Sequence, residues 1–252
     1  MIQLKSDREI ETMAAGGRIL AGALKAMARA VRPGVTTTDL DEIANEFLAT
    51  YPGAEAAFKG LYGFPKSACI SVNQEIVHGI PSPKRSLQEG DIVSLDFGVK
   101  YLGFFTDAAI TVGVGTIDAE SQRLIQVTKT ALQAGIDAAQ PGNHVGDIGA
   151  AIQAVVQAAG YTTADDLVGH YVGYAPHGEP QVPNVGKAKR GQKLVPGLTI
   201  AIEPMVNEGT SRTKTLKDRW TIVTADGRRS AHFEHTVAIT ESGPRILTSA
   251  GD

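Results

Sequence analysis

A short pattern occurs twice in the chain, and this repeat constrains the fold more than any other feature of the sequence. Pro-Gly-x₄-Asp begins at Pro33 and again at Pro141. In both copies a helix-like run precedes the pattern, and a shorter amphipathic run follows it, near residues 38–50 and 145–159. Strand-like runs then follow each helix pair. This order predicts two related halves, about 1–115 and 116–252, unless the pattern is only a common loop-to-helix cap.

Alternating and apolar runs mark the expected strands. We expect them at Ala68–Val72, Asp91–Val99, Phe104–Val112, Thr199–Val206, Trp220–Thr224 and Ala231–Thr240. Ser6 and Glu9 form a capping box where the first helix begins. Because no long linker separates the halves, the sequence predicts one α+β domain over residues 1–252, with antiparallel strands and a fused core.

Composition excludes several classes of protein. The chain has 252 residues, a formal net charge of −3 and 42% hydrophobic residues, whereas disordered chains are less hydrophobic and more charged, and nucleic-acid-binding domains are usually strongly basic. A single cysteine, Cys69, excludes a disulfide framework and a cysteine-based zinc site. The sequence shows neither a signal peptide nor an apolar run of the roughly 20 residues that span a bilayer. We therefore expect a cytoplasmic protein with no membrane or specific nucleic-acid partner.

Two aspartates lie within mainly apolar strand-like runs. If the second and third strands form a hairpin that turns at Tyr101-Leu102, Asp96 faces Asp107 with Cβ atoms roughly 4.5–5.5 Å apart. Like charges in that arrangement destabilise a sheet. A shared divalent cation explains the pairing, because hard cations attract convergent carboxylates.

Two glutamates occupy similar surroundings in the second half. Glu203 precedes a proline that keeps it extended, and Glu234 lies in a strand-like run, although strand interiors disfavour glutamate. Pseudo-two-fold symmetry would bring all four carboxylates together, and two divalent ions would balance their charge. The sequence thus predicts a dinuclear site with ions roughly 3.5–4 Å apart. Taken singly, each acid is more simply explained as a solvated or salt-bridged strand residue.

Three histidines are candidates for the same site. His78 lies in a loop after a strand, and His170 and His177 lie seven residues apart in a glycine-containing segment. A neutral imidazole can bind a metal or stabilise a developing charge, although a lone loop histidine is more often solvated.

We expect no function for the other three histidines. His144, beside the second Pro-Gly, and His232 are expected to be solvated. His235 directly follows Glu234, so alternation turns it to the opposite sheet face and predicts a structural role.

Several short motifs occur in order along the chain: Pro65–Asn73, His78–Pro81, Gly90–Val93, Ile202–Val206, Asp218–Thr221 and Glu234–Thr236. With them, the chain resembles the type I methionine aminopeptidases from its first helix to Leu247. The resemblance implies the α+β pita-bread fold, in which two pseudo-symmetric helix-helix-strand halves form a curved, mostly antiparallel sheet covered by helices.

The resemblance also implies a role for each candidate residue. Five residues would bind two divalent metal ions: Asp96, Asp107, His170, Glu203 and Glu234. Among them, Asp107 and Glu234 would bridge both ions, and Glu203 would also move a proton. His78 and His177 would contact the substrate and the tetrahedral intermediate. The methionine pocket would be lined by Phe64, Cys69 and Trp220, although a buried structural cysteine is a fair alternative for Cys69.

The implied activity is removal of the N-terminal (initiator) methionine from peptides and nascent proteins when the second residue is small, by a hydroxide that bridges the metals. Cobalt, manganese, iron and zinc all suit a carboxylate-rich site with one imidazole, so the metal stays unassigned. We expect a monomer. Basic stretches at 187–190 and 212–217 suggest a transient ribosome contact, although a solvated surface is the simpler explanation.

The chain departs from the family pattern near the expected site. Tyr171 replaces a glycine, Pro176 an aromatic residue and Gly178 an acid, and Leu61 and Tyr62 stand where Tyr and His are common. These changes bear on pocket shape and substrate preference.

Three alternatives stay open. A prolidase or aminopeptidase P has the same fold but usually an additional N-terminal domain. A non-catalytic binding scaffold usually loses metal ligands. A dinuclear phosphoesterase would need a basic or glycine-rich phosphate cradle, which the sequence does not show.

Overall fold

The structure is a computed structural model that describes residues 2–249. Four α-helices occur in this range: α1 (Asp7–Ala30), α2 (Thr37–Ala49), α3 (Ala119–Ala138) and α4 (Val145–Ala158). The predicted capping box is confirmed, because the Ser6 backbone N–H donates to Glu9 Oε2 at 2.8 Å. The helices expected near 38–50 and 145–159 are α2 and α4.

The two Pro-Gly loops make matching backbone hydrogen bonds. The Gly34 N–H donates to Leu87 O at 2.9 Å, and the Gly142 N–H donates to Leu194 O at 2.8 Å. Both glycines have positive φ, 89° and 94°, a backbone conformation that side chains with a Cβ disfavour. Each loop is thus hydrogen-bonded to the segment that leads into a strand of the main sheet, β4 in the first half and β9 in the second.

The helix after each loop is capped in the same way. Asp39 Oδ2 accepts the backbone N–H of Thr36 at 2.8 Å, and Asp147 Oδ2 accepts that of His144 at 2.8 Å. His144 is therefore an N-terminal helix cap rather than a solvated loop residue. Matching caps in both loops support the pseudo-symmetry of the two halves.

The strands are β1 (Ala54–Ala56), β2 (Ala68–Val72), β3 (Glu75–Val77), β4 (Ile92–Tyr101), β5 (Phe104–Gly113), β6 (Thr162–Thr163), β7 (Val168–Gly169), β8 (Val182–Pro183), β9 (Thr199–Ile202), β10 (Met205–Asn207), β11 (Thr213–Thr215), β12 (Ile222–Thr224), β13 (Ser230–His232), β14 (Glu234–Thr240) and β15 (Gly243–Ile246). A short 3₁₀ turn covers Leu61–Gly63. The main sheet follows the order β1-β4-β5-β14-β15, with β2 paired to β4 and β9 paired to β14. All these pairs are antiparallel.

The halves join where β5 meets β14. Glu234 pairs with Ala109 and His235 with Ala108. The Thr236 hydroxyl accepts the Asp107 N–H at 2.9 Å and donates to Asp107 O at 2.8 Å. The junction therefore places an acid of each half side by side.

The predicted register of the central hairpin was wrong by two residues. The turn is Leu102-Gly103, with Asp96 opposite Ala109 and Asp107 opposite Gly98. Both turn residues have positive φ, as in the type I′ turns that suit two-residue hairpins. Because the shift is an even number, the two aspartates still share one face and lie diagonally rather than opposite.

Two predicted strands are each broken in two. Thr199–Val206 divides at Glu203-Pro204 into β9 and β10, and Ala231–Thr240 divides at Phe233 into β13 and β14. After each break the chain changes sheets, because β10 and β13 pair with each other while β9 and β14 belong to the main sheet. The breaks place Glu203 and Glu234 beside the boundary between the two sheets.

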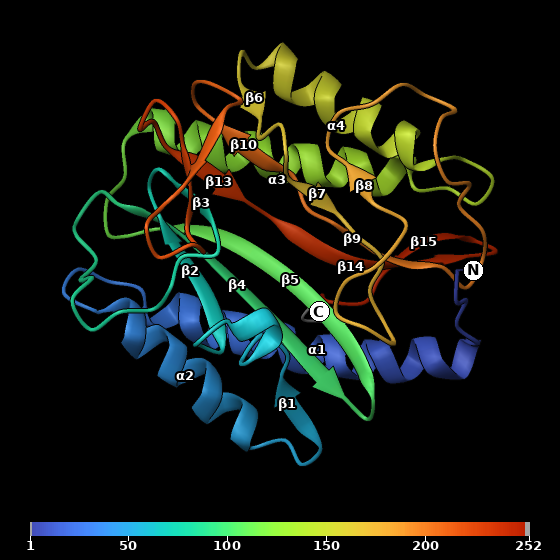
Figure 1. The fold of residues 1–252 in the computed structure, drawn as a ribbon, viewed down its shortest axis with the longest axis horizontal. Helices are drawn as coiled ribbons and strands as arrows, with labels where there is room; N and C mark the ends of the chain where they lie inside the picture. The colour runs from blue at the N-terminus through green and yellow to red at the C-terminus, as the bar shows by residue number, and fades with distance from the viewer. Residues whose placement is uncertain (1, 250–252) are drawn as a thin grey trace.

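The helix pairs lie on opposite sides of the strands in Figure 1, with α1 and α2 below and α3 and α4 above. One apolar cluster, including Leu20 and Phe97, packs α1 and α2 against β2, β4 and β5. A second, including Leu124 and Ile200, belongs to α3, α4 and the strands of the second half. None of the described helices combines the length and apolar character needed to cross a membrane.

Candidate metal centre

All of the candidate residues line one cavity of about 250 Å³: Phe64, Cys69, His78, Asp96, Asp107, His170, His177, Glu203, Trp220 and Glu234. They come from both halves and from strands, strand ends and loops. The cavity has a charged end and an apolar end, which are described in turn.

The floor of the charged end is a row of residues across three strands. Asp96 on β4 pairs with Ala109 on β5, which pairs with Glu234 on β14. Directly paired residues point to the same face of a sheet, so the two carboxylates flank the small Ala109 side chain. Asp107 lies two residues before Ala109 and points to that same face. The sheet therefore gathers three acids around a residue with little bulk.

These acids are buried, and each has an oxygen without a hydrogen-bond partner among the described residues. Asp96, Asp107 and Glu234 are 8%, 5% and 2% exposed. One oxygen of each has no partner among the described residues: Asp96 Oδ1, Asp107 Oδ1 and Glu234 Oε1. Since buried polar atoms are normally satisfied, these oxygens point to an additional binding partner.

Burial raises the pKa of all three acids. It raises the pKa of Asp96 to about 7, and burial together with neighbouring carboxylates raises those of Asp107 and Glu234 well above their usual range. Clustered carboxylates at neutral pH therefore need a compensating positive charge.

The second half adds a histidine and a glutamate. His170 Nε2 lies 3.3 Å from Glu203 Oε1, and burial raises the pKa of Glu203 to about 7. His170 Nδ1 lies 2.8 Å from Tyr171 O; as the donor to this carbonyl, Nδ1 leaves the Nε2 lone pair free. This is the usual arrangement of a metal-binding histidine.

The residues fit two cations. Ligand atoms of Asp96, Asp107 and Glu234 lie within 4.8 Å of one another, and so do those of His170, Glu203 and Glu234. The two groups share Glu234. Carboxylate oxygens with one imidazole suit divalent metals. The buried oxygens without hydrogen-bond partners are available as ligand atoms for such ions.

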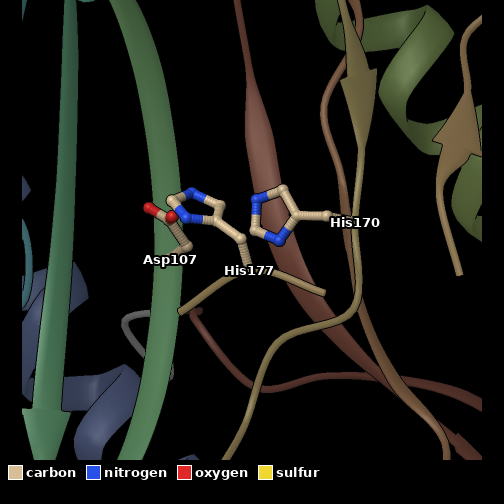
Figure 2. A group of neighbouring side chains, drawn as sticks. All are labelled: Asp107, His170 and His177. Atoms are coloured by element: carbon tan, nitrogen blue, oxygen red, sulfur yellow. The ribbon is translucent and has the colours of Figure 1, made fainter. Parts of the chain in front are cut away.

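His177 lies beside this cluster. Figure 2 shows the ring of His177 between Asp107 on β5 and the ring of His170. The two rings are 4.4 Å apart, edge to face, and the ring of Tyr62 stacks on His177 at 6.0 Å. Burial lowers the pKa of His177, so the ring is neutral at pH 7 and has one N–H to donate.

His78 approaches from the other half. Its backbone has a positive φ of 60°, and the adjacent Gly79 is fixed to β2 by two hydrogen bonds: the Ile70 N–H donates to Gly79 O at 2.8 Å, and the Gly79 N–H donates to Ser71 Oγ at 3.1 Å. Burial lowers the pKa of His78 to about 4, so this ring is also neutral.

The other end of the cavity is apolar. Phe58, Phe64 and Cys69 form a buried cluster against which Trp220 packs, and the rings of Phe64 and Trp220 meet edge to face at 5.1 Å. Burial, followed by the charge of Asp96, raises the pKa of the Cys69 thiol well above its usual value. Cys69 is therefore a neutral, apolar wall residue.

The departures at Tyr171 and Gly178 belong together. Tyr171 does not line the cavity. Lys5 Nζ lies 3.7 Å from the centre of the Tyr171 ring, and the Tyr171 backbone N–H donates to Gly178 O at 3.1 Å. A Cβ at Gly178 would lie 3.1 Å from Tyr171 Cδ1. The small residue thus makes room for the large one, and Leu61 and Tyr62 are the departures that do line the cavity.

The prediction for His232 was wrong. It is not solvated but 2% exposed, and it lines the cavity. The signal was present in the sequence, because His232 precedes Glu234 by two residues and strand alternation places both on one face. For His235 the predicted structural role agrees with its contacts, since its Nδ1 lies 2.9 Å from Thr248 Oγ1.

Known proteins share this architecture and sequence. The model of metallopeptidase family M24 matches residues 11–241. A methionine aminopeptidase of Clostridium perfringens is 51% identical over 98% of this chain and 99% of its own length. The crystal structure of a methionine aminopeptidase from Thermotoga maritima covers 99% of this chain and 100% of its own, with 42% identity and a TM-score of 0.97.

A prolidase from Pyrococcus furiosus shares the fold alone. Its TM-score is 0.79 at 22% identity, and the match covers 99% of this chain but 66% of the prolidase. The methionine aminopeptidases are similar to this chain over their full length, in sequence as well as in fold. The chain therefore belongs to metallopeptidase family M24 and, within it, to the methionine aminopeptidases.

Proposed function

We propose that this protein removes the N-terminal methionine from peptides and nascent proteins when the second residue is small. The observation that carries the proposal is the two-ended cavity, where buried acids with partnerless oxygens face an apolar cluster across about 250 Å³. The relatives named methionine aminopeptidase support it.

Five residues would hold two divalent ions: Asp96, Asp107, His170, Glu203 and Glu234. The four acids among them would contribute four negative charges. Glu234 belongs to both ligand groups, which supports a bridging role, and Asp107 is proposed to bridge as well. When bound, two such ions lower the pKa of water and polarise a carbonyl group. The choice among cobalt, manganese, iron and zinc stays open.

The protein's own groups would then handle protons and charge. Glu203 has a raised pKa, so its carboxylate can hold the proton lost by the attacking water and pass it to the leaving amine. The neutral rings of His78 and His177 can each donate an N–H to the peptide, and His177 to the oxyanion as its charge develops.

The apolar end would select the side chain. Phe64, Cys69 and Trp220 offer a surface that gains free energy by burying the thioether of methionine. Tyr62 and Leu61 lie at the same cavity, so we propose that they affect which second residue is tolerated.

We also propose that residues 1–252 form one catalytic domain with halves of about 1–115 and 116–252, since the main sheet runs through both at β5–β14. A monomer, a cytoplasmic location and a transient ribosome contact stay predictions from the sequence.

The deciding experiment measures free methionine released from Met-Gly-Met-Met and from a Met-Pro peptide. The protein is first chelated, then assayed with and without Mn²⁺ or Co²⁺. Metal-dependent release supports the proposal, with Asp107→Asn as the inactive control. Metal binding without release from any peptide would favour the binding scaffold, and release from Xaa-Pro substrates alone would favour the prolidase alternative.

A further inference from the structure

One histidine at the metal centre has no part in the function proposed above. His232 ends β13, immediately before the break at Phe233 that separates β13 from β14. Its side chain is 2% exposed and lines the cavity beside the acids.

Both ring nitrogens of His232 lack a hydrogen-bond partner among the described residues. A buried imidazole normally has at least one partner. Two carboxylate oxygens lie within 4 Å of Nε2: Glu203 Oε2 at 3.6 Å and Glu234 Oε2 at 3.9 Å. These distances are too long for hydrogen bonds.

The same distances suit donor atoms that share an ion. Nitrogen and oxygen ligands lie about 2.0–2.2 Å from a metal such as zinc, so two of them at a tetrahedral angle are about 3.4 Å apart. His170 Nε2 and Glu203 Oε1 are separated by 3.3 Å. His232 thus stands to one oxygen of Glu203 much as His170 stands to the other.

The backbone of His232 is held firmly. Its N–H donates to Thr111 Oγ1 at 2.9 Å, and that hydroxyl donates back to His232 O at 2.8 Å. Ser94 Oγ lies 2.8 Å from Thr111 Oγ1. The imidazole is therefore presented from a rigid strand end, as a metal ligand requires.

We propose that His232 Nε2 is a further metal ligand, which binds an ion together with Glu203 and gives the centre a second imidazole. The inference rests on the proposed metal centre. Imidazole suits zinc, iron and nickel, whereas carboxylate suits manganese. His232 therefore shifts the preference of the centre away from manganese.

The test uses Co²⁺ alone as the probe, with wild type, His232→Leu and His235→Leu. Leucine has no donor atom, and His235 is the control because it is half-buried on the other face of the neighbouring strand. We expect His232→Leu to weaken Co²⁺ binding at one site by at least ~10-fold and to change the visible absorption of the bound Co²⁺. His235→Leu should leave both unchanged. Identical affinity and spectrum in His232→Leu would overturn the proposal.

A crystal structure of Co²⁺-loaded wild type tests the inference independently of whether His232→Leu folds. We expect an Nε2–cobalt distance of about 2.1 Å, and a distance beyond about 3 Å refutes the ligand role. If the wild-type protein binds no metal, the proposed function and the inference on His232 both fail. If wild type binds metal and releases methionine while His232 stays distant, this inference alone fails.

Discussion

The two halves of the molecule supply their acids in different ways. In the first half, Asp96 and Asp107 lie inside the continuous β4–β5 hairpin. In the second half, Glu203 lies between β9 and β10, and Glu234 is the first residue of β14. A continuous hairpin fixes its acids by register, whereas strand ends let a carboxylate stand between two sheets. The first half thus supplies its acids from within continuous strands. The second half supplies them from strand ends, with Glu234 completing the floor and Glu203 lying at its edge.

The largest expected loss of activity comes from replacing an acid, and the number of ions still bound should differ between a floor acid, Asp107, and the edge acid, Glu203. Asp107→Asn should remove a ligand shared by both ions, so neither stays bound, whereas Glu203→Gln should weaken one ion. Both should lower kcat/KM by more than the ~10³-fold that loss of one oxyanion donor can cost. Metal stoichiometry after gel filtration distinguishes them. Equal stoichiometries in the two variants would show that the halves do not differ in this way.

The two neutral histidines offer a second comparison, one from each half. His177→Ala should lower kcat by ~10²–10³-fold because it removes a donor to the developing charge, with two ions still bound. His78→Ala should show the same pattern. Metal content that falls in parallel with activity would instead place the histidine among the metal ligands, as the closeness of His177 to Asp107 and His170 allows.

The space between the floor acids can be filled without removing a metal ligand. Ala109→Leu places a bulky side chain between Asp96 and Glu234, which should weaken metal binding by ~10–100-fold, the effect typical of residues that position ligands. Ala108→Val is the matched control, because residue 108 points to the opposite face. Undiminished metal affinity in Ala109→Leu would mean that the carboxylates do not meet across this residue.

The chelated protein should lose stability as pH rises. Asp96 and Glu203, one from each half, have a pKa of about 7 when folded, above their unfolded values near 4. Between roughly pH 4 and 7 the folded state therefore binds more protons, so the free energy of unfolding falls with increasing pH. Thermal melting in chelator should show a falling Tm, and saturating Mn²⁺ should remove the fall. A Tm that is constant across this range in chelator would contradict the raised pKa values.

The smallest effects concern the loops in which the halves agree. Gly34→Ala and Gly142→Ala force a Cβ into a positive-φ position, which should lower the free energy of unfolding by about 1–2 kcal/mol each. Neither Cβ would meet another atom within 4 Å, so strain alone acts. Denaturant unfolding measures both changes. Strongly unequal losses would show that the shared hydrogen bonds do not make the loops energetically alike.

Sequence patterns predicted the floor better than the edge. Alternation within long strands placed Asp96 and Asp107 on one face, even though the unrecognised turn at Leu102-Gly103 shifted their register. The break at Phe233 could not be predicted, because it depends on β13 pairing with β10 rather than on local propensity. His232, in contrast, could have been assigned to the face of Glu234 from their two-residue spacing.

The cavity geometry also depended on contacts between distant segments. The sequence showed that Tyr171 replaces a glycine, but not that its ring would lie against Lys5. The packing of Tyr171 against Gly178 likewise depends on the folded loop between them, which the sequence alone did not show. Residue types and motif order predicted which residues meet, and tertiary pairing decided how they are oriented.

The break between β9 and β10 has a consequence for biosynthesis. Glu203 reaches its place when two separate sheets have both formed, and Glu234 adds a ligand 138 positions after Asp96. Contacts of such long range cost more loop-closure entropy than local ones and slow folding. A copy of this peptidase that is still being synthesised thus has no complete hydrolytic centre. The proposed ligand set would therefore be complete only in a chain whose two halves have both folded.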